Sequence, residues 1–384
     1  MMHKIKSHYI IAAAYFLILC IWFYVINEEH FAFDFQSTST NPFYFKPSAS
    51  IWFQNFVLQH FNKFFTHLLC IVVIPFSIYL LLVTIYSRYI SPLWASFIAL
   101  LSLSVYENLS FHAYLLNIFN LPAVDRFISA PLIFDFPLPG LSTLYFLIVY
   151  FFITQYKKIR LPLITLFSLV VAADFYINAI DALFLVAFWF IYFPYKIYRE
   201  KLYSLSRVVL ITVLQILIIF ACILPGLSAG KINPDLSPVD TLPLYSISFN
   251  LLLPAALMAL LYVIQRIDLD EILFKFRHIY ALMLVEGFVI LVTQTGILPI
   301  DLLVLRSRIL QFFIHLFYFV PVLYYVGRPA YHYSRGSEAK SFAAALRESI
   351  YLLYSRQEKN ISITLIFLLL IYNLFPLLML FNPK

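Results

Sequence analysis

The stretch YIIAAAYFLILCIWFYVI, Tyr9 to Ile26, decides the fold. It contains no charged residue, and its length is close to the ~20 apolar residues that a helix needs to cross a bilayer. Similar runs recur along a chain that is 63% hydrophobic and 12% charged, with a mean hydropathy of +0.89. A soluble domain of this length carries about a quarter charged residues. The composition therefore predicts an integral membrane protein with several spans.

The apolar runs lack the alternation of outer-membrane strands, which predicts an all-α, polytopic helix bundle of about 11 spans. We expect one transmembrane domain over residues 1–384. The first run lacks a small-residue cleavage site and is followed by other spans, so we interpret it as a retained anchor. The expected spans are 9–26, 67–86, 90–106, 140–156, 161–178, 181–195, 208–225, 244–264, 279–296, 309–326 and 361–381.

The basic residues predict the orientation. With a cytoplasmic N-terminus, the inner connections hold 19 of the 26 lysines and arginines, as the positive-inside rule requires. Outer loops are then expected near 27–66, 107–139 and 226–243, and an inner segment near 327–360 contains an expected interfacial helix. In such a protein the formal charge of +7 indicates topology, and it does not indicate nucleic acid. The expected location is a bacterial inner membrane.

A group of acidic residues follows the first span directly, in NEEHFAFDF, Asn27 to Phe35. Asp34, Glu28 and Glu29 are candidate catalytic residues. One of these carboxylates could act as a general base at the membrane surface, or hold a divalent cation (Mg²⁺ or Mn²⁺) beside a lipid phosphate. The alternative is that they only mark where the span ends and water begins.

Further polar residues fall in or beside the other expected outer loops. Asp125 and Arg126 could bind substrate, or form a local ion pair without function. Asp174, in ADFYINAID, lies at membrane depth, and its spacing from Asn178 would place both on one helix face. A capped helical turn is the alternative for that segment.

Arg306 and Arg308 lie on the expected outer side, against the inside bias of basic residues. A phosphate or pyrophosphate is a natural partner for two guanidinium groups, and pairing with Asp301 is the alternative. Glu286 is the carboxylate that we place well inside a span. A buried Glu there is protonated, hydrogen-bonded across helices or part of an ion pathway, and His315 is a candidate partner.

The layout resembles the GT-C superfamily of membrane glycosyltransferases. The resemblance implies a polyprenyl-phosphate-linked sugar donor used at the outer face of the membrane. NEEHFAFDF follows the first span, where similar proteins carry a catalytic acidic residue, so Asp34 or Glu28 and Glu29 would have that role. Asp125 and Arg126 stand in the second outer loop, and Arg306 and Arg308 would contact the lipid phosphate.

We therefore expect a membrane glycosyltransferase that modifies an envelope glycan or lipid, with a glycan or lipid as acceptor. One alternative is a transporter or flippase of a lipid-linked or amphipathic substrate, which would use Glu286 and Asp174 along its pathway. Another is a non-catalytic scaffold subunit of an envelope-polysaccharide complex.

Overall fold

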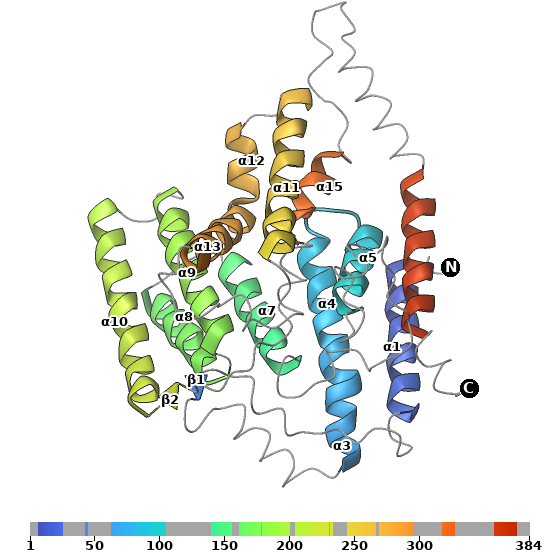
Figure 1. Ribbon diagram of the computed structural model, residues 1–384, viewed down its shortest axis with the longest axis horizontal. Helices are drawn as coiled ribbons and strands as arrows, with labels where there is room; N and C mark the ends of the chain where they lie inside the picture. The colour runs from blue at the N-terminus through green and yellow to red at the C-terminus, as the bar shows by residue number, and fades with distance from the viewer. Residues whose placement is uncertain are drawn as a thin grey trace, which may run out of the picture.

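The computed structural model is almost entirely helical in the part of the chain that it describes (Figure 1). Most of the helices run roughly parallel or antiparallel to one another, and one of them crosses in front of the others. The structure describes residues 7–25, 43–44, 63–104, 140–155, 161–177, 179–199, 204–229, 231–232, 244–265, 269–294, 317–326 and 357–374.

The first helices follow the expected spans closely, and a π-helical turn interrupts the second of them. Pro75 has no N–H to donate, and a wider turn immediately before it accommodates the lost hydrogen bond. The elements are α1 (Ser7–Val25), α3 (Lys63–His67), the π-helix η3 (Leu68–Val73), α4 (Ile74–Tyr86), α5 (Pro92–Leu103) and α7 (Gly140–Gln155).

A described helix also overlaps each of the later expected spans, and α12 is a short helix that the sequence did not predict. The elements are α8 (Leu161–Ala173), the 3₁₀-helix η5 (Asp174–Tyr176), α9 (Ala179–Arg199), α10 (Leu205–Ala229), α11 (Leu244–Gln265), α12 (Leu269–Lys275), α13 (Arg277–Gln294), α15 (Val320–Val326) and a helix over residues 357–374.

Within the described part of the chain, three helical stretches are long and apolar enough to cross a membrane: His8–Val25, Phe64–Tyr86 and Leu205–Leu224. The last of these presents large apolar side chains on its exposed face, such as Leu210 at 68% and Leu217 at 59% exposure. An apolar face of this extent suits hydrocarbon and not water. The finding supports the prediction of a membrane protein.

Many serine and threonine side chains bond to their own helices. Ser77 donates to the carbonyl oxygen of Val73 at 2.7 Å, and Ser102 donates to that of Ile98 at 2.8 Å. A hydroxyl that finds its acceptor one turn back needs no water. These short polar residues are therefore compatible with apolar surroundings.

The helix over residues 357–374 lies beside α1, as Figure 1 shows in red and blue. Asn373 joins it to two other helices. Its side-chain Nδ2 donates to Ser104 Oγ at 2.8 Å, and its backbone oxygen accepts from Trp22 Nε1 at 3.2 Å. Interhelical bonds of this kind stabilise membrane bundles by about 1 kcal/mol each.

The described strands are a two-residue antiparallel pair, β1 (Phe43–Tyr44) and β2 (Lys231–Ile232). They are too short to change the helical class. β1 comes from the first expected outer loop and β2 from the third. These two loops therefore meet, and they do so beside the end of α10 (Figure 1).

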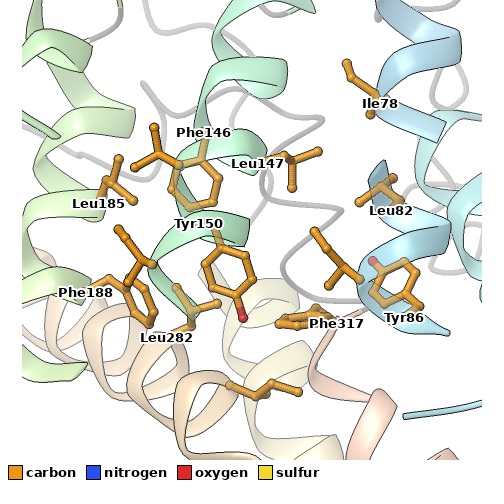
Figure 2. Packing of buried hydrophobic residues seen from close by; sticks show 14 of the residues in the cluster. Ile78, Leu82, Tyr86, Phe146, Leu147, Tyr150, Leu185, Phe188, Leu282 and Phe317 are labelled. Atoms are coloured by element: carbon orange, nitrogen blue, oxygen red, sulfur yellow. The ribbon is translucent and has the colours of Figure 1, made fainter. Parts of the chain in front are cut away.

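Aromatic side chains fill the middle of the bundle. Figure 2 shows Tyr150 of α7 and Phe317 between Tyr86 of α4 and Phe188 of α9. The ring centroids of Tyr150 and Phe317 are 5.6 Å apart in an edge-to-face arrangement, and those of Tyr150 and Phe188 are 5.4 Å apart. Aromatic pairs of this geometry contribute about 1 kcal/mol beyond their buried area. This packing positions the polar groups described next.

Candidate functional site

Most of the predicted site residues lie outside the described part of the chain. Asp174 is the member of the predicted set that the structure describes, so any convergence of the others remains a prediction. The residues outside are Glu28, Glu29, Asp34, Asp125, Arg126, Arg306 and Arg308.

Asp174 is fully buried where η5 contacts α7, α8 and α9. It lies within electrostatic range of Tyr145, whose hydroxyl donates to the carbonyl oxygen of Val170 at 2.7 Å. α8 ends at Ala173, a 3₁₀ turn follows over Asp174–Tyr176, and the next helix begins at Ala179. The expected shared face with Asn178 therefore stays a prediction. Asn178 itself is outside the described residues.

An apolar cavity of about 280 Å³ lies between α11, α12 and α13. Its walls include Pro254 and Met258 of α11, Ile272 of α12 and Met283 of α13. Ligand pockets are typically apolar with a few polar groups that fix orientation. Here the polar groups available come from tyrosines, because Tyr280 and Tyr318 also line the cavity.

Glu286 of α13 is fully buried, and its carboxyl group is linked to this cavity through one of the lining tyrosines. The Tyr318 hydroxyl donates a hydrogen bond to Glu286 Oε2. Since Tyr318 lines the cavity, the pair connects the apolar space to a titratable group. His315, the partner considered from the sequence, is outside the described residues. Tyr318, three residues further along, is a partner that the sequence did not reveal.

A second polar site surrounds His278, at the start of α13 and just before the expected span 279–296. Its Nε2 shares a hydrogen bond of 3.1 Å with the hydroxyl of Tyr89. Four aromatic rings contact the imidazole, and we call these five residues the histidine cluster. The centroid distances from His278 are 5.4 Å to Tyr89, 5.9 Å to Phe317, 6.2 Å to Tyr150 and 6.4 Å to Tyr192.

Burial is the main cause that lowers the pKa of His278, to about 3. The positive charges of Arg277, Lys196 and Arg88 lower this pKa further. The imidazole is therefore neutral at physiological pH, and the three nearby cations favour that neutral state.

The described residues contain no group of three or more His, Cys, Asp and Glu side chains that could hold a metal ion. The first-loop acids, which are the predicted ligands for Mg²⁺ or Mn²⁺, lie outside those residues. Carboxylate oxygens suit either ion, so the chemistry of these residues fits a divalent cation.

The sequence did not single out His278, Tyr318 or Tyr280. One signal was present for His278, in the run LFKFRHIY, where basic and aromatic residues alternate at the end of an inner connection. Tyr318 gave no such signal, because it is one of 28 tyrosines in a chain that also contains 41 phenylalanines.

Comparison with known proteins adds no relative: the chain matches no family model, no curated protein and no solved structure. Its function therefore has to be argued from its own residues.

Proposed function

We propose that this chain is a multi-span glycosyltransferase of the bacterial inner membrane, with the GT-C layout and about 11 crossings. It transfers a sugar from a polyprenyl-phosphate donor to a glycan or lipid acceptor at the outer face. The supporting observation among the described residues is the apolar cavity between α11, α12 and α13. Its wall of Pro, Ala, Met and Tyr side chains suits a hydrocarbon chain, which reaches it laterally from the bilayer.

In this proposal, the first outer loop activates the acceptor. The carboxylate of Asp34, or of Glu28 with Glu29, takes the proton of the acceptor hydroxyl. The acceptor oxygen then bonds to the anomeric carbon of the sugar, and the bond from that carbon to the donor phosphate breaks.

The other predicted residues bind the donor. The polyprenyl phosphate leaves with the bonding electron pair, and Arg306 and Arg308 stabilise the charge that develops on it. Asp125 and Arg126 contact the substrate, and the fully buried Asp174 has no direct role in this step. Mg²⁺ or Mn²⁺, if bound by the acids, would supply further charge neutralisation.

Release of polyprenyl phosphate from a panel of polyprenyl-phosphate-linked sugars in proteoliposomes tests the reaction. We expect Asp34→Asn, or Glu28→Gln with Glu29→Gln, to reduce release by about 100-fold or more, the usual contribution of a general base. Asp270→Asn is the control, because it removes an exposed carboxylate of α12 on the expected inner side. Full activity in both first-loop variants would exclude this mechanism.

A bulky residue in the cavity tests the binding of the donor chain. Ala259 lines the cavity and Ala256, one turn earlier on α11, does not. We expect Ala259→Phe to raise the donor concentration required for half-maximal release, and Ala256→Phe to leave it unchanged. If the two variants required the same donor concentration, the cavity would not be the binding site of the donor chain.

A second function, movement of a lipid-linked substrate across the bilayer, is favoured by Glu286. Its carboxyl group is buried at membrane depth and bonded to a cavity-lining tyrosine. Such groups often mark transport pathways. Movement of a fluorescent polyprenyl phosphate that survives loss of the first-loop acids but is abolished by Glu286→Gln would favour transport over transfer.

A further inference from the structure

Hydrogen bonds join the helix over residues 357–374 to the ends of α1 and α5. Asn373 on this helix donates from its side-chain Nδ2 to Ser104 Oγ at 2.8 Å. Its backbone oxygen accepts a bond of 3.2 Å from Trp22 Nε1. Along the chain, Asn373 is 351 residues from Trp22 and 269 from Ser104, so the tertiary fold brings them together. We call these three residues the junction.

The junction lies out of contact with water. Trp22 is 1%, Ser104 3% and Asn373 4% exposed. Asn373 Nδ2 also donates to the carbonyl oxygen of Leu369 at 2.8 Å, and Ser104 Oγ donates to that of Leu100 at 2.7 Å. Each polar side chain is therefore bonded both to its own helix and across to a neighbour. Because water cannot replace a lost partner in such surroundings, these bonds hold the helices in a defined relative position.

The junction stands at the base of two expected outer loops. Trp22 lies in the last turn of α1, and the loop expected at 27–66 follows. Ser104 is the residue directly after α5, and the loop expected at 107–139 follows it. The first loop carries the candidate catalytic acids, and the second carries the Asp–Arg pair that is predicted to contact the substrate. Asn373 is therefore bonded to the base of each loop.

We propose that Asn373 is a positioning residue, which fixes the base of the first outer loop relative to the base of the second. This inference rests on the proposed function, because it gives the junction the task of holding the first-loop carboxylate in register with the substrate-binding loop. The junction itself does not touch the substrate. A displacement of about 1 Å at a reacting group can slow the chemical step by up to ~100-fold, even when the changed residue lies elsewhere. Loss of the bond between Asn373 and Ser104 should therefore act on kcat.

Two neighbouring serines provide matched variants. Ser102 and Ser104 are both buried, and each donates to a carbonyl oxygen four residues earlier, at 2.8 and 2.7 Å. Ser104 also accepts from Asn373, whereas Ser102 interacts with the hydroxyl of Tyr86 on α4. Replacing either serine by alanine thus removes one buried hydroxyl, and only one of the two changes affects the junction.

The kinetics of sugar transfer test the positioning role. Ser104→Ala should lower kcat roughly tenfold and leave unchanged the donor concentration required for half-maximal release, because the cavity between α11, α12 and α13 is intact. Ser102→Ala should keep the wild-type kcat, and Ser104→Thr, which retains the hydroxyl, should restore most of it. Adding Asn373→Ala to Ser104→Ala should lower kcat no further, because both remove the same bond. Equal kcat in Ser104→Ala and Ser102→Ala, with transfer still dependent on Asp34, would overturn the positioning role alone.

A distance measurement separates this inference from the proposed function, because it needs no sugar transfer. Spin labels at Ser37→Cys in the first loop and Ser129→Cys in the second, with the three native cysteines replaced by alanine, report the distance between the loops by pulsed electron paramagnetic resonance. We expect Ser104→Ala to broaden the distribution of label distances and Ser102→Ala to leave it unchanged. An unchanged distribution in Ser104→Ala would overturn the inference. A broadened distribution in a chain that releases no polyprenyl phosphate would support the positioning of the loops and exclude sugar transfer.

Discussion

Helix α13 buries two titratable side chains, His278 and Glu286, about 12 Å apart at 1.5 Å per residue. The imidazole lies among three positive charges and stays neutral. The carboxyl group accepts a hydrogen bond from Tyr318 behind an apolar cavity. One helix therefore carries a group that burial, together with neighbouring cations, keeps uncharged and a group that accepts a hydrogen bond from a hydroxyl. This difference separates the start of α13, where a neutral imidazole lies near cations, from a deeper part of the helix beside an apolar cavity.

Phe317 connects the two regions, and its truncation is expected to have the largest effect. Its buried ring contacts those of Tyr86 and His278 at 5.5 and 5.9 Å, and its sequence neighbour Tyr318 holds Glu286. Phe317→Ala should lower the free energy of unfolding by about 3–5 kcal/mol, through lost contacts and the cavity that remains.

Denaturant unfolding in detergent measures this loss. Phe288→Ala is the control, because Phe288 lies on α13 but is 65% exposed. If Phe317→Ala were no less stable than Phe288→Ala, the two regions would not share a packed core.

The next largest effect concerns the Glu286 end. Tyr318→Phe keeps the ring but removes the donor to a buried carboxyl group, which should cost about 1–3 kcal/mol of unfolding free energy. Glu286→Gln keeps an acceptor for the same hydroxyl and should cost less. The same unfolding titration compares the two variants. A larger loss in the glutamine variant would show that the charge of Glu286, and not its bond to Tyr318, stabilises this end.

These regions also show what the sequence could predict. Long apolar runs such as 9–26 and 208–225 predicted their helices closely, because burial in hydrocarbon depends on composition and length alone. The end of α8 at Ala173 comes earlier than the expected end at 178, since a 3₁₀ turn differs from a continuing helix only in how three residues pack. Asp174 was identified because a carboxylate is rare in an apolar run.

The partners of α13 could not be identified in that way. Tyr89 and His278 are 189 residues apart, and Tyr318 is 32 residues from Glu286. Periodicity reports which face of a helix is apolar, but it does not report which other helix meets that face. Both contacts depend on tertiary packing, and both involve tyrosine, of which the chain has 28.

Acid should destabilise the His278 end. The folded pKa of about 3 lies below the ordinary value of 6.5, so the unfolded chain binds the proton more readily. The stability that His278 contributes is therefore present above pH 6.5 and is lost as the pH falls towards 3. Between pH 7 and pH 5.5 the loss should be on the order of 1 kcal/mol.

The melting temperature in detergent across this pH range, compared with that of His278→Asn, measures the effect. Asparagine does not titrate, so the variant should show a flatter profile. The rings of Tyr89, Tyr150 and Tyr192 face the imidazole, and the charges of Arg88, Lys196 and Arg277 act on it. Parallel profiles for the two proteins would assign the acid sensitivity to other groups.

The smallest expected effect separates two tyrosines of the histidine cluster. Tyr89 bonds to His278 at 3.1 Å, whereas the buried hydroxyl of Tyr150 has no hydrogen-bond partner among the described residues. Tyr89→Phe should cost about 0.5–1.5 kcal/mol of unfolding free energy, since it leaves an imidazole nitrogen unsatisfied. Tyr150→Phe removes a hydroxyl whose burial is itself unfavourable, so the variant should be as stable as the wild type or more stable. A loss in Tyr150→Phe equal to that in Tyr89→Phe would mean that the cluster acts as one polar network. The neutral histidine would then be held by all of its tyrosines together and not by Tyr89 alone.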